Sequence, residues 1–296
     1  MSNRLKWEVF VSGQIPVVTN DLPPGATEMK WSPISSTLIS GERDAVLVDT
    51  PITVDQNLKL VDWIVSSGKN LTAIYATHGH GDHFFGVSTI QKRFPKARFV
   101  ATREAIGVMR KQASVPVVRA YWEPRFPGQI DSTLVIADEL VEGVIELERE
   151  QLVVVPLGHT DTDSTTCLHV PSIGLVVCGD ALYNDVHLHL GESDAEGRKE
   201  WIAALDTIES LKPVAAIAGH KRPGAADTPT NIKATRKYIR DFDRIAAQTT
   251  TAIELYNEML AIYPRPCEPG GVVVFGTGGE TRDLSTNSVV IAREDR

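Results

Sequence analysis

Cysteine is scarce in this chain, and no apolar run is long. Of 296 residues only three are cysteines, Cys167, Cys178 and Cys267, and none forms a Cys-x-x-Cys pair. An odd and sparse set suits a reducing compartment and argues against a disulfide framework. No stretch approaches the ~18 uninterrupted apolar residues that a membrane span requires. We therefore expect no membrane partner.

Basic residues are in short supply as well. The chain has 30 Lys and Arg against 38 Asp and Glu, which gives a formal net charge of −8. Proteins that bind nucleic acid gain their affinity from clustered basic side chains, so no nucleic-acid partner is expected. The N-terminal residues 1–8 are interrupted by charges and lack the apolar segment of a secretory signal. These absences together predict a cytoplasmic protein.

What remains is the composition of a globular protein, 42% hydrophobic and 23% charged. We expect residues 1–30, rich in proline and turn formers, to form an irregular lead-in. Ordered structure is predicted to begin with a hairpin of residues 36–40 and 45–49. A helix over residues 55–67 and a buried strand over 71–77 follow.

The rest of the chain is also predicted to alternate between helices and strands. The pattern predicts helices over 83–94, 102–113 and 196–211, strands over 97–101, 144–148, 152–156, 165–170, 175–178 and 214–218, and a long helical stretch over 230–262. The last residues, 270–291, contain β-rich pieces between glycines. Strands followed by helices, twice over, favour two packed sheets with helices outside.

Residues 114–140 have no period. Three prolines there accompany Tyr121, Trp122 and Phe126. Irregular, aromatic-rich segments of this length are usually functional loops, so a substrate loop is one interpretation. Packing against the edge of the sheet is the other, and the sequence does not decide between them.

Directly after the predicted strand 71–77, the chain reads His78-Gly79-His80-Gly81-Asp82-His83. Residues two apart in an extended segment point to one side, so His78 and His80 can bind one metal ion. Asp82 and His83 begin the next helix and can bind a second. Imidazole and carboxylate are ligands that Zn²⁺ prefers, whereas a loop of ordinary surface histidines would have no reason to crowd together.

Three further ligand-type residues lie just past apolar strands. They are His159, Asp180 and His220, and each is directly preceded by glycine. Strand ends are where α/β sheets form their sites, so we expect these side chains to meet the first motif.

The seven residues resemble the metallo-β-lactamase-fold hydrolase superfamily in type, order and position, over about residues 36–220. The resemblance implies an α/β fold, a four-layer αββα sandwich, as a single domain over residues 1–296 with a C-terminal helix and β-rich tail at 230–296. It implies two divalent ions, Zn²⁺ first and Mn²⁺ or Fe²⁺ as alternatives. By resemblance one ion is bound by His78, His80 and His159, the other by Asp82, His83 and His220, with Asp180 bridging both.

The stretch Asp180-Ala181-Leu182-Tyr183 resembles the Asp-Ala-x-Tyr of acyl-homoserine lactone lactonases, in which the tyrosine reaches the substrate carbonyl. This implies hydrolysis of a small cyclic ester or amide, a lactone first and a lactam or cyclic carbamate next, by a metal-bound hydroxide. Tyr183 would stabilise the oxyanion, and Asp180 or Asp82 would pass the proton to the leaving group. A thioester hydrolase of the glyoxalase II kind and a non-catalytic metal-stabilised binding module remain alternatives.

Other residues are candidates for supporting roles. His187 and His189 follow Tyr183 and, with Trp122, are expected to contact the substrate. Asp49, Asp161 or Asp163 is expected to orient a ligand imidazole through its second ring nitrogen. Apolar positions in the helical stretch are candidates for a homodimer contact: Ile245, Ile253, Leu255 and Met259.

Overall fold

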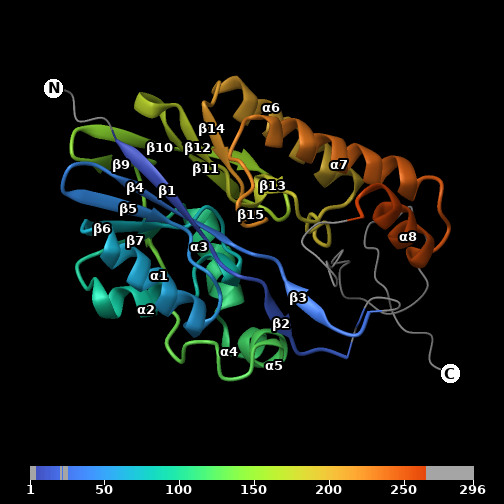
Figure 1. The fold of residues 1–296 in the computed structure, drawn as a ribbon, viewed down its shortest axis with the longest axis horizontal. Coiled ribbons are helices and arrows are strands. Elements are labelled where there is room, and N and C mark those ends of the chain that lie inside the picture. Colours follow the sequence, from blue (N-terminus) through green and yellow to red (C-terminus); the bar gives the residue numbers. More distant parts are fainter. Residues whose placement is uncertain (1–4, 21, 23–25, 265–296) are drawn as a thin grey trace.

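Two β-sheets lie face to face, with helices on the outer face of each (Figure 1). A computed structural model describes residues 5–20, 22 and 26–264. The first sheet has six strands in the order β1-β4-β5-β6-β7-β8, and the second has five in the order β14-β12-β11-β10-β9. The predicted four-layer αββα sandwich is therefore confirmed.

The six-stranded sheet changes from antiparallel to parallel across its width. Its strands are Lys6–Val11 (β1), Ser35–Ser40 (β4), Asp44–Val48 (β5), Asn70–Tyr75 (β6), Arg98–Ala101 (β7) and Asp138–Glu139 (β8). β1, β4 and β5 pair antiparallel, which confirms the predicted hairpin, and β5 to β8 run parallel. The parallel strands end at one edge of the sheet, where the His78–His83 loop begins.

Three helices cover the outer face of this sheet: Val54–Ser66 (α1), Val87–Arg93 (α2) and Arg103–Gln112 (α3). Thr53 begins α1 with a capping box, because its side chain accepts from the Gln56 amide while the Gln56 side chain accepts from Thr53. The helix buries Leu60 and Ile64 against the sheet. Of the expected helices, α1 and α3 agree to within one residue at each end, whereas α2 begins four residues later than expected.

The expectation of an irregular lead-in is wrong for part of residues 1–30. β1 pairs along its whole length with β4, from Lys6 opposite Ser40 to Val11 opposite Ser35. A second, small hairpin follows, made of Ile15–Val17 (β2) and Met29–Trp31 (β3). Pro16 lies in β2 and not in β1, so β1 is free to form an edge strand.

The five-stranded sheet is antiparallel except where β12 meets β14. Its strands are Val144–Leu147 (β9), Glu150–Gly158 (β10), Thr165–Val170 (β11), Leu175–Val177 (β12) and Ala215–Ile217 (β14), with a 3₁₀ turn at Pro171–Ile173 (η3). The helices Ala195–Ser210 (α6) and Thr230–Ala246 (α7) cover its outer face (Figure 1). A further helix, Ala252–Ile262 (α8), packs on α7.

The helical stretch expected over 230–262 is two helices. Thr251 begins α8 with a capping box to Glu254, which stops α7 from continuing. Ile245, Leu255 and Met259 are buried in this chain's own core, so of the positions expected at a dimer contact only Ile253 is exposed. The β-rich tail expected at 270–291 lies outside the described residues.

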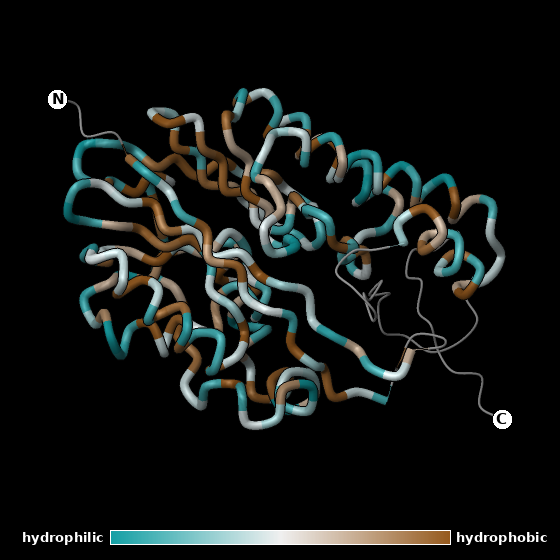
Figure 2. Tube along the Cα trace, viewed as in Figure 1, coloured by the Kyte–Doolittle hydropathy of each residue, from teal (hydrophilic) through white to brown (hydrophobic). Residues whose placement is uncertain are grey.

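Apolar residues fill three layers of core. Val46, Val48 and Tyr75 meet Leu168 and Leu175 between the two sheets. Figure 2 shows hydrophobic residues along the strands and hydrophilic ones on the outer turns of α6 and α7. None of the helices in residues 5–20, 22 and 26–264 is long and apolar enough to cross a membrane.

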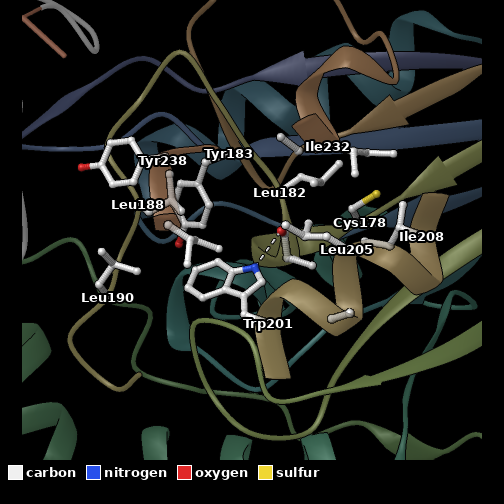
Figure 3. Packing of buried hydrophobic residues seen from close by; sticks show 14 of the residues in the cluster. Cys178, Leu182, Tyr183, Leu188, Leu190, Trp201, Leu205, Ile208, Ile232 and Tyr238 are labelled. Carbon is white, nitrogen blue, oxygen red and sulfur yellow. Dashed lines mark hydrogen bonds between the residues drawn. The ribbon is translucent and has the colours of Figure 1, made fainter. Parts of the chain in front are cut away.

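Trp201 fixes α6 against the segment that leads into the predicted site. Its ring is fully buried beneath Tyr183 and Leu188, as Figure 3 shows, and its Nε1–H donates to the Ala181 carbonyl at 2.9 Å. Ala181 directly follows Asp180. The buried Trp201 side chain therefore fixes the position of the turn that contains Asp180.

Candidate metal centre

Seven buried His and Asp side chains meet at the edge where β6, β10, β12 and β14 end. In each of two groups, one nitrogen or oxygen atom per residue lies within 4.8 Å of those of the others. The first group comprises His78, His80, Asp161 and Asp180, and the second comprises Asp82, His83 and His220. Segments more than 140 positions apart in the sequence thus converge on one place.

Short elements place these side chains. His78 and His80 lie in the loop after β6, and Asp82 and His83 in the 3₁₀ turn Gly81–His83 (η1). Asp180 lies in the 3₁₀ turn Gly179–Ala181 (η4). His220 begins the short strand His220–Lys221 (β15), which runs parallel to Tyr183–Asn184 (β13) and so brings Tyr183 opposite His220.

Two glycines explain why glycine precedes Asp180 and His220. A Cβ atom on Gly219 would lie 2.1 Å from Asp180 Oδ1. Gly179 has a positive φ of 52°, and a Cβ there would lie 2.3 Å from Thr77 Oγ1. Side chains at either position would push the segments apart, so the glycines permit the close approach that the site requires.

In the first group, Asp161 faces both histidines. Its Oδ2 lies 3.0 Å from His80 Nδ1 and 3.8 Å from His78 Nε2. The other ring nitrogen of His80 points away, with Nε2 3.2 Å from Glu192 Oε1. Glu192 also accepts a hydrogen bond from the Thr162 hydroxyl, so this carboxylate is held in place.

Asp180 lies between the two groups. Its Oδ1 is 3.1 Å from His83 Nε2, and its Oδ2 is 3.2 Å from His220 Nε2. His220 Nε2 is also 3.5 Å from Asp82 Oδ2. The Asp180 carboxylate therefore contacts the second group while belonging to the first, as a bridging ligand would.

The second nitrogens of the ligand histidines are held by fixed acceptors. His83 Nδ1 lies 3.1 Å from Asp49 Oδ2, and His220 Nδ1 lies 3.1 Å from the Pro33 carbonyl. Asp49 is itself fixed by two hydrogen bonds of 2.8 Å from the Thr77 amide and hydroxyl. Metal-bound histidines carry such partners, which leave the other nitrogen as the ligand atom.

Four atoms of this centre test whether metal ions fit. His78 Nε2, His83 Nε2, Asp161 Oδ2 and Asp180 Oδ1 are buried and form no hydrogen bond among the described residues, although each belongs to an ion pair of 3.0–3.8 Å. Polar atoms that are buried without hydrogen bonds are unfavourable, so four of them converging on one place favour a bound ligand. Nitrogen and carboxylate oxygen are the donors that divalent transition metals accept.

The charge of the centre also fits bound metal ions. Four carboxylates, those of Asp49, Asp82, Asp161 and Asp180, are buried, and their only ion-pair partners in the described part of the chain are histidines. Two divalent cations would balance these four negative charges. The residues present therefore fit a pair of metal ions.

Neighbouring charges override burial at these groups. Burial lowers the pKa of the His220 imidazole, but Asp180 and Asp82 raise it to about 9. Burial raises the pKa of the Asp180 carboxyl, but His220 and His83 bring it well below its usual range. The carboxylates are thus ionised and attract positive charge to the centre.

The structure does not bring His159 into either group. Its Nδ1 lies 2.6 Å from Asp163 Oδ1 and its Nε2 lies 2.7 Å from Ser193 Oγ, so both ring nitrogens are engaged elsewhere. Ser193 in turn donates to the Thr160 carbonyl. Asp161, expected only to orient an imidazole, occupies the place expected for His159, whereas Asp163 orients the His159 ring.

Tyr183 lies at the centre, as expected. Its hydroxyl donates to Asp180 Oδ2 at 2.9 Å, and its ring is stacked on that of His220 with 5.4 Å between the ring centroids. His189 lies at the border of the site, its ring 6.0 Å from that of His80. His187 is instead hydrogen-bonded through Nδ1 to the Tyr238 hydroxyl of α7, at 2.8 Å.

Trp122, expected to contact the substrate, is buried among other aromatic side chains. Segment 114–140 folds into Val115–Val117 (α4), a π-helical turn Val118–Trp122 (η2) and Glu123–Arg125 (α5). Trp122 is 3% exposed, packs edge-on against Trp31 and Phe85, and donates through Nε1 to Gln112. Of the two interpretations of this segment, packing on the sheet layer is the one that holds for Trp122.

Two site residues carried little signal in the sequence. Trp31 donates from its indole N–H to Asp82 Oδ2 at 2.9 Å, although it lies 51 positions earlier in the chain. Glu192, beside His80, also borders a cavity of about 510 Å³. The other residues that line this cavity are His159, Asp163, Gly191, Asp194, Glu196, Gly197 and Glu200.

An αββα sandwich with paired His and Asp clusters at one sheet edge defines a class of metal-dependent hydrolase folds. A family model described as the metallo-beta-lactamase superfamily matches residues 29–220. The chain therefore belongs to the metallo-beta-lactamase superfamily, whose members are largely metal-dependent hydrolases.

Solved structures agree at the level of the fold. A metallo-beta-lactamase from Hirschia baltica is 17% identical with a TM-score of 0.56, over 80% of this chain and 97% of that one. One from Pontibacter korlensis is 15% identical with a TM-score of 0.54, over 80% and 100%. FIM-1 from Pseudomonas aeruginosa, in a mono-zinc form, is 14% identical with a TM-score of 0.54, over 80% and 96%. No curated protein matches the chain.

Proposed function

We propose that this protein is a dinuclear metal-dependent hydrolase that opens a small cyclic ester or amide, a lactone first and a lactam or cyclic carbamate next. The observation that carries the proposal is the pair of buried His and Asp groups that share Asp180. A structural metal site needs only one closed set of ligands, whereas two adjacent groups around a shared carboxylate are typical of hydrolytic centres.

The first ion would be held by His78, His80 and Asp161, the second by Asp82, His83 and His220, with Asp180 between them. We propose Zn²⁺, with Mn²⁺ or Fe²⁺ as alternatives that this nitrogen and oxygen set also accepts. Bound divalent ions of this kind lower the pKa of water to near neutrality and polarise a carbonyl oxygen.

The chain's own residues would then position the substrate and move the proton. Burial, reinforced by the Asp180 charge, raises the pKa of the Tyr183 hydroxyl well above its usual range, so that it stays protonated. Its single O–H donates to Asp180 Oδ2 and would turn from there to a substrate oxygen. Asp180 and Asp82 are ionised carboxylates beside the centre and can accept a proton and pass it to the leaving group. A ring-opened leaving group stays tethered, so prompt protonation prevents it from closing again.

Removing the Tyr183 hydroxyl should slow turnover without loss of the bound metal ions. We expect Tyr183→Phe to lower kcat by about 100-fold, the usual effect of losing one donor to a developing oxyanion. Tyr263→Phe, which removes a hydroxyl that donates to Asp241 at 2.7 Å and belongs to neither ligand group, is the matched control and should keep its activity. Metal content and steady-state kinetics of both variants test this; equal kcat values for wild type and Tyr183→Phe would contradict the role of Tyr183.

A substrate panel tests the proposed reaction. The metal-loaded protein is assayed with lactones of increasing acyl length, β-lactams, cyclic carbamates and S-lactoylglutathione. Ring opening of a lactone, lactam or carbamate supports the proposal, whereas turnover of the thioester alone selects a hydrolase of the glyoxalase II kind. Binding of ring compounds without any turnover would select a metal-stabilised binding module.

A further inference from the structure

Trp31 reaches the second group of ligands from outside the sandwich. It ends β3, the second strand of the small hairpin that lies between β1 and β4 in the chain. Its Nε1–H donates to Asp82 Oδ2 at 2.9 Å. Among the described residues, this is the hydrogen bond that ties the Asp82 carboxylate to a part of the chain outside the His and Asp groups.

Without such a hydrogen bond, the orientation of the Asp82 carboxylate would not be fixed. Asp82 lies in a 3₁₀ turn of only three residues, and its Oδ2 is shared with His220 Nε2 at 3.5 Å. A carboxylate can rotate about its side-chain bonds, and which oxygen faces the ion then depends on what holds the other lone pairs. The indole N–H occupies one lone pair of Oδ2 and so fixes the rotation.

Trp31 is itself held rigidly. Its ring meets those of Trp122 and Phe126 edge-on, with centroid distances of 5.6 Å and 5.5 Å. Trp122 is anchored in turn through its own N–H to Gln112. The donor to Asp82 is therefore placed by packing before any ion binds.

We propose that Trp31 is a positioning residue for the second metal ion, acting through Asp82. The indole N–H holds the carboxylate in the orientation that the ion requires, and the hairpin thereby contributes to the affinity of one of the two ion positions. This inference rests on the metal centre of the proposed function and is independent of the substrate.

The test is a calorimetric Zn²⁺ titration of the full chain with ion counting. We expect wild type to bind two ions per chain and Trp31→Phe to bind one of them about 10- to 100-fold more weakly, the usual effect of losing a group that orients a ligand. The control is Trp63→Phe, which removes an indole N–H from α1, where the ring packs on Phe10, and it should bind both ions like wild type.

A double variant separates positioning from packing. Because Trp31 acts through Asp82, Asp82→Ala combined with Trp31→Phe should bind the second ion no worse than Asp82→Ala alone. Additive losses, equal losses in Trp31→Phe and Trp63→Phe, or unchanged binding by Trp31→Phe would each overturn the inference. A wild-type chain that binds no second ion would instead contradict the proposed function, and this inference with it.

Discussion

Chelation of divalent ions is expected to abolish turnover of whichever substrate the protein hydrolyses and to lower its melting temperature by roughly 10 °C or more. Each ion present at about 1,000 times its Kd stabilises the folded state by about 4 kcal/mol. For a chain of this size that corresponds to about 2–4 °C per kcal/mol.

Differential scanning calorimetry and a turnover assay before and after chelation measure both effects. Adding back Zn²⁺, Mn²⁺ or Fe²⁺ should restore both, and the ion that restores most identifies the working metal. Mg²⁺ serves as the control, because it prefers an all-oxygen octahedral site and should restore neither. Full activity in a chain shown to be free of metal would contradict the account.

The second large effect concerns Asp161 and His159, of which only one completes the first group. We expect Asp161→Asn to lower the affinity of that ion by more than about 100-fold, because a ligand counts for more than a group that orients one. His159→Gln should cost about 10-fold or less, because the His159 ring nitrogens are engaged by Asp163 and Ser193.

Asp163→Asn is the matched control for this pair. It removes the carboxylate that faces His159 Nδ1 and leaves Asp161 in place, so the ion count should not change. A Zn²⁺ titration of the three variants decides the order. If His159→Gln loses the ion and Asp161→Asn keeps it, the ring must turn into the centre when metal binds, and the ligand set implied by the family resemblance is correct.

Much of the centre could be predicted because its residues lie at strand ends. The loop from His78 to His83 combines ligand-type residues at a spacing that an extended segment and a following turn place on different sides. Asp180 and His220 each follow a glycine after an apolar strand, and both prove to require that glycine for close packing. Local sequence was enough here because the ligand and the element that positions it are neighbours in the chain.

Long-range contacts account for what could not be predicted. The orientation of the His159 ring depends on Ser193, 34 residues later, and Asp82 is held by Trp31, 51 residues earlier. Trp122 was expected near the substrate because aromatic residues in an aperiodic segment are typical of loops, yet Trp31 and Phe85 enclose it. The periodicity of a sequence does not indicate which aromatic rings from distant segments pack on one another.

Two errors in the fold had readable signals. The alternation in Lys6–Val11 is that of a half-exposed edge strand, with Lys6 and Glu8 exposed and Trp7 and Val9 partly buried. The division of the C-terminal helical stretch is marked by Thr251 and Glu254, whose spacing is that of a capping box. Both signals were local, and the surrounding composition obscured them.

The most direct measurement is a crystal structure of the metal-loaded protein with anomalous diffraction at the absorption edge of the bound metal. The account predicts two anomalous peaks, one among His78, His80 and Asp161, the other among Asp82, His83 and His220, with Asp180 beside both. A single peak, or two peaks away from these side chains, would contradict it.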